Sequence, residues 1–433
     1  MVRRSRDAMR VLVLAPPMAS VGGIQRYTHT LVRALKHLLG DGSVRCLAIS
    51  EAPDRNGGRR FPARSKLSFG CHALWEVVCW RPDLIICTHL ALGPIGWLAR
   101  TLAGPPYWIV VHGIEAWGVL PGWKRGALRQ ADRVMVTSAF SREQVVKRHQ
   151  IDEKRTSSLP CTLDETLLSA EPAEGGAWAR ISDGQRLVLT VARMAARECY
   201  KGHDVVLRAL PSVVGKIPNL TYIMVGGGDD RPRLEGLAQE LGLTKHVVFT
   251  GEVADSELAA LYHRSEVFLL PARTVIDKYN PKGEGFGIVF VEAMAFGKPV
   301  IGPNYGAPAE IIRQGQHGLL VDPEDSAAIA EALVDLLTNP ARAREMGEAG
   351  SEWVRRHYSY DSFREMLREI LAGGHAADRD ENIMSNESRK TAIARPLLEG
   401  LFVLWVIVVN LLYYFQFKGL LVTRFARLLH RWH

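Results

Sequence analysis

Short apolar runs alternate with helical patterns along the first half of the chain, and this alternation most narrowly limits the fold. The first run, 10–15, reads RVLVLA and has the length and composition of a buried strand. After a Gly22-Gly23 turn, residues 25–39 carry apolar side chains at helical spacing. Further strand-like runs follow at 44–49, 83–87, 108–111 and 133–137. Strands separated by helices predict a parallel sheet with crossover connections.

The same alternation starts again after a segment with little periodicity. Residues 159–186 contain two prolines and three glycines, which is typical of a connection between domains. Beyond it we expect strands at 187–191, 220–225, 247–250, 267–270 and 299–301. Helices are expected at 202–216, 231–241, 255–263, 286–296, 327–337 and 341–357. The chain is therefore predicted to form an α/β fold of two doubly wound, Rossmann-like domains, 1–165 and 166–372, which face a cleft.

Charge is distributed unevenly between the two halves. The first 170 residues hold 24 Lys and Arg against 13 Asp and Glu, whereas the remaining 263 hold 30 against 33. A basic half suits nucleic acid, an anionic membrane surface or a phosphorylated acceptor. No zinc-finger spacing, RNP-type aromatic strand or basic heptad favours nucleic acid. The six cysteines form no CxxC pair, so we expect a reduced, cytosolic setting and no metal site.

The composition changes sharply after the second predicted domain. Residues 373–396 are polar and are expected to form a tether, and the run 400–417 contains no charged residue. Residues 420–432 then place three arginines opposite apolar side chains, as in an interfacial helix. We predict that 397–433 attaches the protein to the cytoplasmic face of the cell membrane. Both flanks are basic, so a span and a shallow insertion stay open, and a buried terminal helix is the alternative.

Glu284 and Glu292 stand eight residues apart in GEGFGIVFVEAMA, which is the most informative motif of the chain. The first acid lies in a Gly-rich loop and the second in the expected helix 286–296. Gly285 and Gly287 leave backbone N–H groups bare at the start of that helix, which favours an anion. A sugar nucleotide, with phosphate between hydroxyl-bearing groups, suits this arrangement. The alternative is a glutamate that only complements the helix dipole.

Other candidate residues follow strand ends. Gly22 and Gly23 let a ligand approach the start of a helix, although a tight turn explains them as well. Arg193 and Lys201 come after the first strand of the second domain and can clamp a diphosphate, unless they are solvated surface cations. His112 ends another strand, and a structural role is its alternative. Two further strand-end turns are 226–229 and 248–253.

In this order the segments resemble the retaining glycosyltransferases of family 4, which have the GT-B fold. The resemblance covers about residues 9–372, and the ordered set is specific although its single members are not. Its motifs are Gly22-Gly23, His112-Gly113, Arg193, Lys201-Gly202, 225–228, Glu284, Glu292, 297–301, 305–310 and 318–323. The C-terminal segment departs from the family pattern.

The resemblance implies a role for each matching residue. Glu292 would accept hydrogen bonds from the nucleotide ribose, and Glu284 would contact hydroxyls of the donor sugar. The implied catalytic residues are His112, Arg193, Lys201 and Glu284. The implied donor-binding residues are Gly22, Gly23, Gly227, Val253, Phe286, Gly287, Ile288, Val289 and Glu292. No metal and no cofactor is implied, because the Arg and Lys neutralise the leaving diphosphate.

The implied activity is retaining transfer of a hexose from a nucleoside diphosphate sugar to a lipid-linked acceptor. Residues 1–165 would hold the acceptor and 166–372 the nucleotide sugar, in polysaccharide, lipopolysaccharide, exopolysaccharide or glycolipid synthesis. A cluster in the first domain suits an anionic membrane, with ordinary core tryptophans as the alternative: Trp108, Trp117, Trp123, Lys124, Arg125 and Arg129.

Two other functions fit the same fold. A sugar-nucleotide 2-epimerase resembles it but needs no membrane segment, and a non-catalytic scaffold would only recruit partners to the membrane. The sequence leaves open the nucleobase, the sugar, the acceptor with its linkage, and the oligomeric state.

Overall fold

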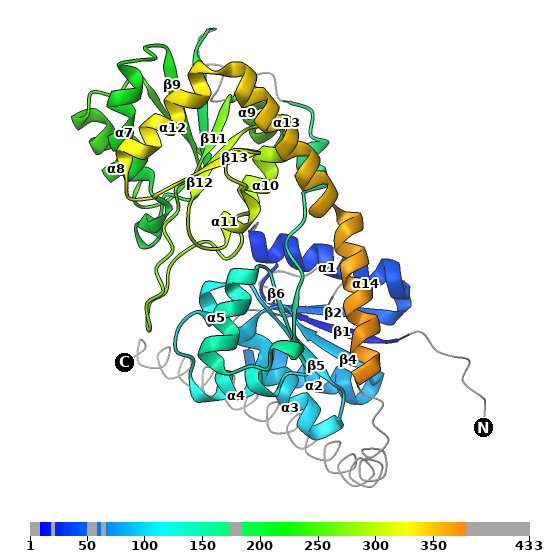
Figure 1. The fold of residues 1–433 in the computed structure, drawn as a ribbon. Helices are drawn as coiled ribbons and strands as arrows, with labels where there is room; N and C mark the ends of the chain where they lie inside the picture. Colours follow the sequence, from blue (N-terminus) through cyan, green and yellow to red (C-terminus); the bar gives the residue numbers. More distant parts are fainter. Residues whose placement is uncertain (1–8, 19–21, 50–58, 62–65, 173–183, 378–433) are drawn as a thin grey trace, which may run out of the picture.

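The computed structural model describes residues 9–18, 22–49, 59–61, 66–172 and 184–377, which form two α/β units (Figure 1). The first unit contains a seven-stranded sheet in the order β3-β2-β1-β4-β5-β6-β7, and the second a six-stranded sheet in the order β10-β9-β8-β11-β12-β13. Neighbouring strands pair in parallel throughout both orders. The two parallel sheets predicted from the sequence are therefore present.

The central strands of the first unit are apolar and buried because helices cover the sheet on both sides. All five residues of β1 are buried. Its strands are β1 Val11–Ala15, β2 Val44–Ile49, β3 Arg59–Phe61, β4 Leu84–Cys87, β5 Tyr107–Val111, β6 Arg133–Val136 and β7 Thr156–Ser158. Its helices are α1 Gly23–Leu39, α2 Lys66–Trp80, α3 Gly93–Ala103, α4 Gly122–Gln130 and α5 Ala139–His149. The segment 159–172, here called the linker, then leads out of β7 and contains α6 Glu165–Leu168.

The second unit repeats this construction. Its strands are β8 Arg186–Val191, β9 Leu220–Val225, β10 Val247–Gly251, β11 Val267–Leu269, β12 Val300–Pro303 and β13 Gly318–Val321. Its helices are α7 His203–Val214, α8 Arg231–Glu240, α9 Asp255–Arg264, α10 Ile288–Ala295, α11 Pro308–Ile311, α12 Ser326–Thr338 and α13 Pro340–His357. Helix α10 begins two residues later than predicted, because Gly287 has a φ of 104°, outside the helical region.

The last described helix, α14 Tyr360–Ala377, crosses back to the first unit and lies beside α1 (Figure 1). Its residues Phe363 and Leu367 join a core that also contains Tyr27 and Leu31 of α1. The sequence analysis assigned residues up to 372 to the second domain and expected a tether from residue 373. In the structure α14 continues to Ala377 and packs on the first unit. The predicted tether beyond residue 377 and the segment 397–433 lie outside the described residues. Within the described part, no helix is long and apolar enough to cross a bilayer.

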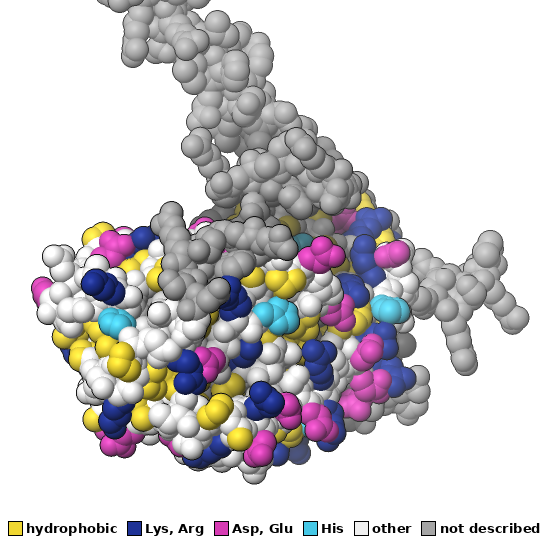
Figure 2. Space-filling model, turned by 90° about the horizontal axis from the view of Figure 1, so that it is seen from above, with side chains coloured by type: hydrophobic (Ala, Val, Ile, Leu, Met, Phe, Trp, Pro, Cys, Tyr) yellow, Lys and Arg dark blue, Asp and Glu magenta, His cyan; other side chains and the backbone are white. Residues whose placement is uncertain are grey.

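Two of the tryptophans that were predicted to face an anionic membrane are buried, so the prediction is wrong for them. Trp108 and Trp117 are only 5% and 0% exposed. Trp108 belongs to β5 and packs in the core, and the Trp117 indole donates a hydrogen bond of 3.2 Å to Ser141 Oγ. Trp123 is 55% exposed and keeps Lys124 beside its ring. The face seen in Figure 2 mixes acidic, basic and apolar side chains rather than gathering one kind.

Candidate functional site

The two units touch where the end of β5 meets the Gly-rich loop before α10. A Cβ built on Gly285 would lie 1.9 Å from the His112 carbonyl oxygen, and one on Gly113 would lie 2.6 Å from Gly285 Cα. The hydroxyls of Thr137 and Ser138 donate hydrogen bonds of 3.3 and 2.9 Å to the Gly285 carbonyl. Only glycine permits this approach, so the structure brings the predicted His112 and Glu284 segments together across the units.

Lys201 and Glu284 form an ion pair at this junction. Lys201 Nζ lies 2.6 Å from Glu284 Oε1, and the Lys201 residue is 9% exposed. Lys201 ends a 3-10 helix, and Gly202 follows with a φ of 78° and would place a Cβ 2.5 Å from the Pro271 carbonyl. Because the ammonium is largely desolvated, its interaction with an anion is strengthened. The site therefore contains a fixed cation, Lys201, beside a carboxylate, Glu284, that can accept hydrogen bonds from hydroxyl groups.

Arg193, the other predicted cation, binds a different carboxylate. Its guanidinium lies 2.7 Å from Oε1 of the buried Glu198, while the Arg193 side chain remains 63% exposed. The Met194 amide donates a hydrogen bond of 2.8 Å to the Gly227 carbonyl, so the ends of β8 and β9 are packed together. Arg193 is thus held at a strand end with its guanidinium open to solvent. Gly226 bridges Gly251 at the end of β10, which brings the turn leading to the predicted Val253 to this edge.

His112 is a half-buried, neutral imidazole. Its Nε2 lies 2.8 Å from the Thr88 carbonyl oxygen, so this nitrogen carries the proton and donates. The ring packs edge-on against Tyr27 with centroids 5.1 Å apart. Burial lowers the pKa of His112, and the nearby Glu115 opposes that effect. With Nε2 protonated, Nδ1 is the acceptor of this ring.

Glu292 is engaged from both units. Arg26 of α1 lies 2.8 Å from Glu292 Oε1, and the Tyr262 hydroxyl donates a 3.1 Å hydrogen bond to Oε2. The glutamate is 3% exposed. Burial raises the pKa of Glu292 to about 7, and the Arg26 charge opposes that effect. A carboxylate with these two partners keeps lone pairs for further hydroxyl donors.

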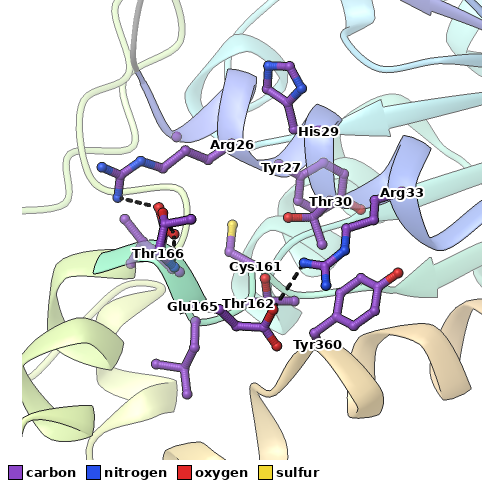
Figure 3. Close-up of a pocket in the computed structure, with 14 residues that line it drawn as sticks. Arg26, Tyr27, His29, Thr30, Arg33, Cys161, Thr162, Glu165, Thr166 and Tyr360 are labelled. Atoms are coloured by element: carbon purple, nitrogen blue, oxygen red, sulfur yellow. Dashed lines mark hydrogen bonds and ion pairs between the residues drawn. The ribbon is translucent and has the colours of Figure 1, made fainter. Parts of the chain in front are cut away.

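A cavity of about 300 Å³ lies between α1, the linker and the start of α10 (Figure 3). Gly23 and Ile288 both line it, so two predicted donor-binding positions share one space. No side chain of the described chain caps α10, which begins after Gly287. Phe286 is 7% exposed and packs against Tyr358, so its side chain belongs to the core. Val289 likewise packs against that core, and Gly22 directly precedes α1.

Sequence reasoning assigned no role to Arg26 and Glu310, which join the units, or to Tyr262, which supports Glu292 within the second unit. Glu310 accepts hydrogen bonds from the Ala139 and Phe140 amides at the start of α5. Arg26 lies in the first turn of α1, soon after Gly22 and Gly23, and this position could have marked it as a residue of the site. Glu310 ends the motif 305–310, but nothing there points to its partners Ala139 and Phe140, and Tyr262 carries no signal at all. Among the described residues no group of three or more His, Cys, Asp or Glu side chains is placed to hold a metal.

Both units match known family profiles. The glycosyl transferase 4-like domain matches residues 22–162, and the group 1 glycosyl transferases match residues 179–353. The chain is 33% identical over 293 residues to the GDP-mannose-dependent alpha-(1-6)-phosphatidylinositol monomannoside mannosyltransferase of Mycolicibacterium smegmatis, which covers 66% of this chain and 75% of that protein.

Solved structures show the same fold. Sucrose-phosphate synthase from Thermosynechococcus elongatus aligns with a TM-score of 0.66 at 24% identity, over 85% of this chain and 100% of that chain. The HepE protein of Anabaena, in complex with UDP, aligns with a TM-score of 0.69 at 18% identity, over 84% of this chain and 100% of that chain. These likenesses confirm the predicted GT-B arrangement of two α/β domains.

Proposed function

Because the chain belongs to the glycosyltransferases built from a 4-like domain and a group 1 domain, we propose that it is a retaining, metal-independent hexosyltransferase. Its donor is a nucleoside diphosphate sugar and its acceptor is lipid-linked. The observation that carries this proposal is the contact of His112 with Gly285, which joins the neutral imidazole, Glu284 and Lys201 in one site. The relative from Mycolicibacterium smegmatis supports the lipid acceptor, since its name specifies a phosphatidylinositol monomannoside.

The donor lies along the edge of the second unit in this proposal. Glu292 accepts hydrogen bonds from the ribose, and Glu284 accepts them from the sugar. The amides at the start of α10 bind the diphosphate, with Gly22 and Gly23 approaching from the first unit. Lys201 and Arg193 neutralise the charge that develops as the diphosphate leaves.

Transfer with retention proceeds on one face of the sugar. The acceptor oxygen forms its bond to the anomeric carbon as the bond from that carbon to the diphosphate oxygen breaks. The acceptor proton passes to the departing phosphate oxygen, so no separate base is required. Neutral His112 orients the sugar through its acceptor nitrogen. Within this scheme no cofactor takes part.

GDP-mannose is the first donor to test, because the related mannosyltransferase uses it. The acceptor binds at the first unit, whose segment of the sequence is basic and suits an anionic lipid headgroup. Residues 397–433 attach the enzyme to the cytoplasmic face of the membrane and bring it to that lipid. The 2-epimerase alternative has no support in the relatives named above.

A transfer assay tests the proposal. The full chain is incubated with radiolabelled GDP-, UDP- or ADP-hexose and membrane lipid, and label is measured in the organic extract. We expect label from one donor, lost on the order of 100-fold in Lys201→Ala because one charge-stabilising group is removed. Lys216→Ala, on an exposed residue of the same unit, should match the wild type. Epimerised donor without extractable label would contradict the proposal, as would a chain that binds no nucleotide.

A further inference from the structure

Arg26 connects three segments of the chain around one guanidinium. It stands in the first turn of α1, 2.8 Å from Glu292 Oε1 of α10. The same guanidinium lies 3.4 Å from Asp164 in the linker and 3.8 Å from Asp255 on α9. Figure 3 shows Arg26 extending from α1 toward the linker. A single side chain of the first unit therefore contacts both the linker and the second unit.

The contact with Glu292 differs from an ordinary surface ion pair. The Glu292 side chain is 3% exposed, whereas those of Arg26 and Asp255 are 30% and 54% exposed. A buried carboxylate without a cation is strongly disfavoured, and it takes up a proton instead. Burial raises the pKa of Glu292 to about 7 even with Arg26 present. The Arg26 charge therefore decides how much of Glu292 is ionised near neutral pH.

Ionisation matters for the hydroxyl groups that Glu292 can bind. An ionised carboxylate offers only acceptor oxygens, whereas a protonated one turns one oxygen into a donor. A ribose presents two adjacent hydroxyls, and two acceptor oxygens match them. Losing the charge also removes the charge-assisted strength of these hydrogen bonds.

We propose that Arg26 is a positioning residue that orients and charges Glu292 for the donor ribose. Because Arg26 belongs to the other unit, Glu292 becomes a full acceptor only when the two units are closed. Donor recognition is thereby coupled to closure without direct contact between Arg26 and the sugar being transferred. This inference rests on the proposed role of Glu292 in donor binding.

The other titratable groups around Glu292 do not supply this pH dependence. They are Cys161 and Asp164 in the linker and Asp255 and Tyr262 on α9. Burial raises the pKa of Cys161 to about 12 and that of Tyr262 well above its usual value. Burial also acts on Asp164, but hydrogen bonds from Thr166 and the Arg26 charge leave its pKa lowered. Between pH 6 and 9 these three groups therefore keep one charge state, and the Asp255 side chain is largely exposed.

The test is binding of GDP and of UDP by calorimetry across about pH 6 to 9, a range that brackets the ordinary titration of a buried carboxylate. In the wild type, the affinity should fall as the pH drops through about 7, where Glu292 takes up a proton. Arg26→Gln should move that midpoint to higher pH and weaken binding at neutral pH about tenfold, since one pH unit of displacement corresponds to tenfold. Arg26→Lys keeps a cation and should raise the midpoint by less than Arg26→Gln does.

Lys36→Gln is the matched control, because Lys36 is also on α1 but pairs with Asp41 inside the first unit. It should bind both nucleotides as the wild type does. An Arg26→Gln midpoint equal to that of the wild type would overturn the inference while leaving the proposed function intact. If Arg26→Gln does not fold, the same comparison is made with Arg26→Lys, whose midpoint must then move upward by a smaller, measurable amount. Nucleotide binding tests Arg26 even if no sugar transfer is detected.

Discussion

Glu310 of the second unit accepts a 2.9 Å hydrogen bond from the Ala139 amide of the first unit. It also accepts one from the next amide, that of Phe140, so a single carboxylate caps the start of α5. A negative charge at a helix N-terminus is favourable, because the unpaired amides and the helix dipole both attract it. The cap forms only while the units are closed, so Glu310 contributes to closure rather than to the stability of either unit alone.

Replacing Glu310 with Ala should open the molecule. The lost cap is worth about 1 kcal/mol, which shifts a balanced equilibrium between closed and open units about fivefold. We expect a larger radius of gyration in X-ray scattering and a lower transfer rate. Glu331→Ala, on the exposed face of α12, serves as the control. Unchanged scattering together with full activity would show that the cap does not hold the units together.

Gly285→Ala should separate the units at the centre of the site. The added Cβ would meet the His112 carbonyl at 1.9 Å, and backbone cannot yield there as a flexible side chain can. A misplacement of about 1 Å costs transfer on the order of 100-fold. Gly236→Ala is the matched substitution, because its Cβ meets no atom within 4 Å on α8. Steady-state kinetics of both variants distinguish a local clash from a general effect of alanine.

The stability of the protein should depend on pH through Glu292. Its pKa rises from 4.5 to about 7 on folding, so the folded state holds this proton more tightly than the unfolded state. The resulting stabilisation is complete below about pH 4.5 and is lost as the pH rises through about 7. Glu292→Gln should remove this part of the pH dependence of the melting temperature. Parallel curves for the two proteins between pH 4.5 and 8 would contradict the assignment.

Removing residues 397–433 should release the protein from membranes. The apolar run and its basic flanks predict attachment by burial and by attraction to anionic lipid. We expect the shortened chain in the supernatant after ultracentrifugation, with GDP binding unchanged and transfer to lipid reduced. Replacing Arg424 and Arg427 with Gln in the full chain tests the electrostatic part separately. A shortened chain that still sediments with vesicles would place the attachment elsewhere.

Elements whose evidence is local were predictable from the sequence. Residues 10–15 and 220–225 are short, apolar and flanked by turn residues, and they form β1 and β9. The short edge strands β3 and β7 were missed because three residues carry no usable period. Helix α10 was predicted too long, since apolar Phe286 fits the pattern but Gly287 interrupts the helical backbone.

Contacts between distant residues were not predictable in this way. Arg26 and Glu292 are 266 positions apart, and no pattern in either segment predicts that the two side chains form an ion pair. The motif order did predict that the His112 and Glu284 segments belong to one site. It did not reveal that Trp117 is a core residue at that junction. A tryptophan followed by cations gives the same sequence pattern whether its ring is buried or lies on the surface.

The return of α14 to the first unit limits how the two units can move relative to each other. The chain passes between the units twice, once through the linker and once from α13 to α14, so relative rotation is restricted to axes near both crossings. The described chain leaves from α14, on the half that would receive the acceptor. An attachment formed by later residues would thus hold the acceptor half stationary at the lipid surface. The half that carries the donor would then be the moving part, free to exchange spent nucleotide while the other stays in place.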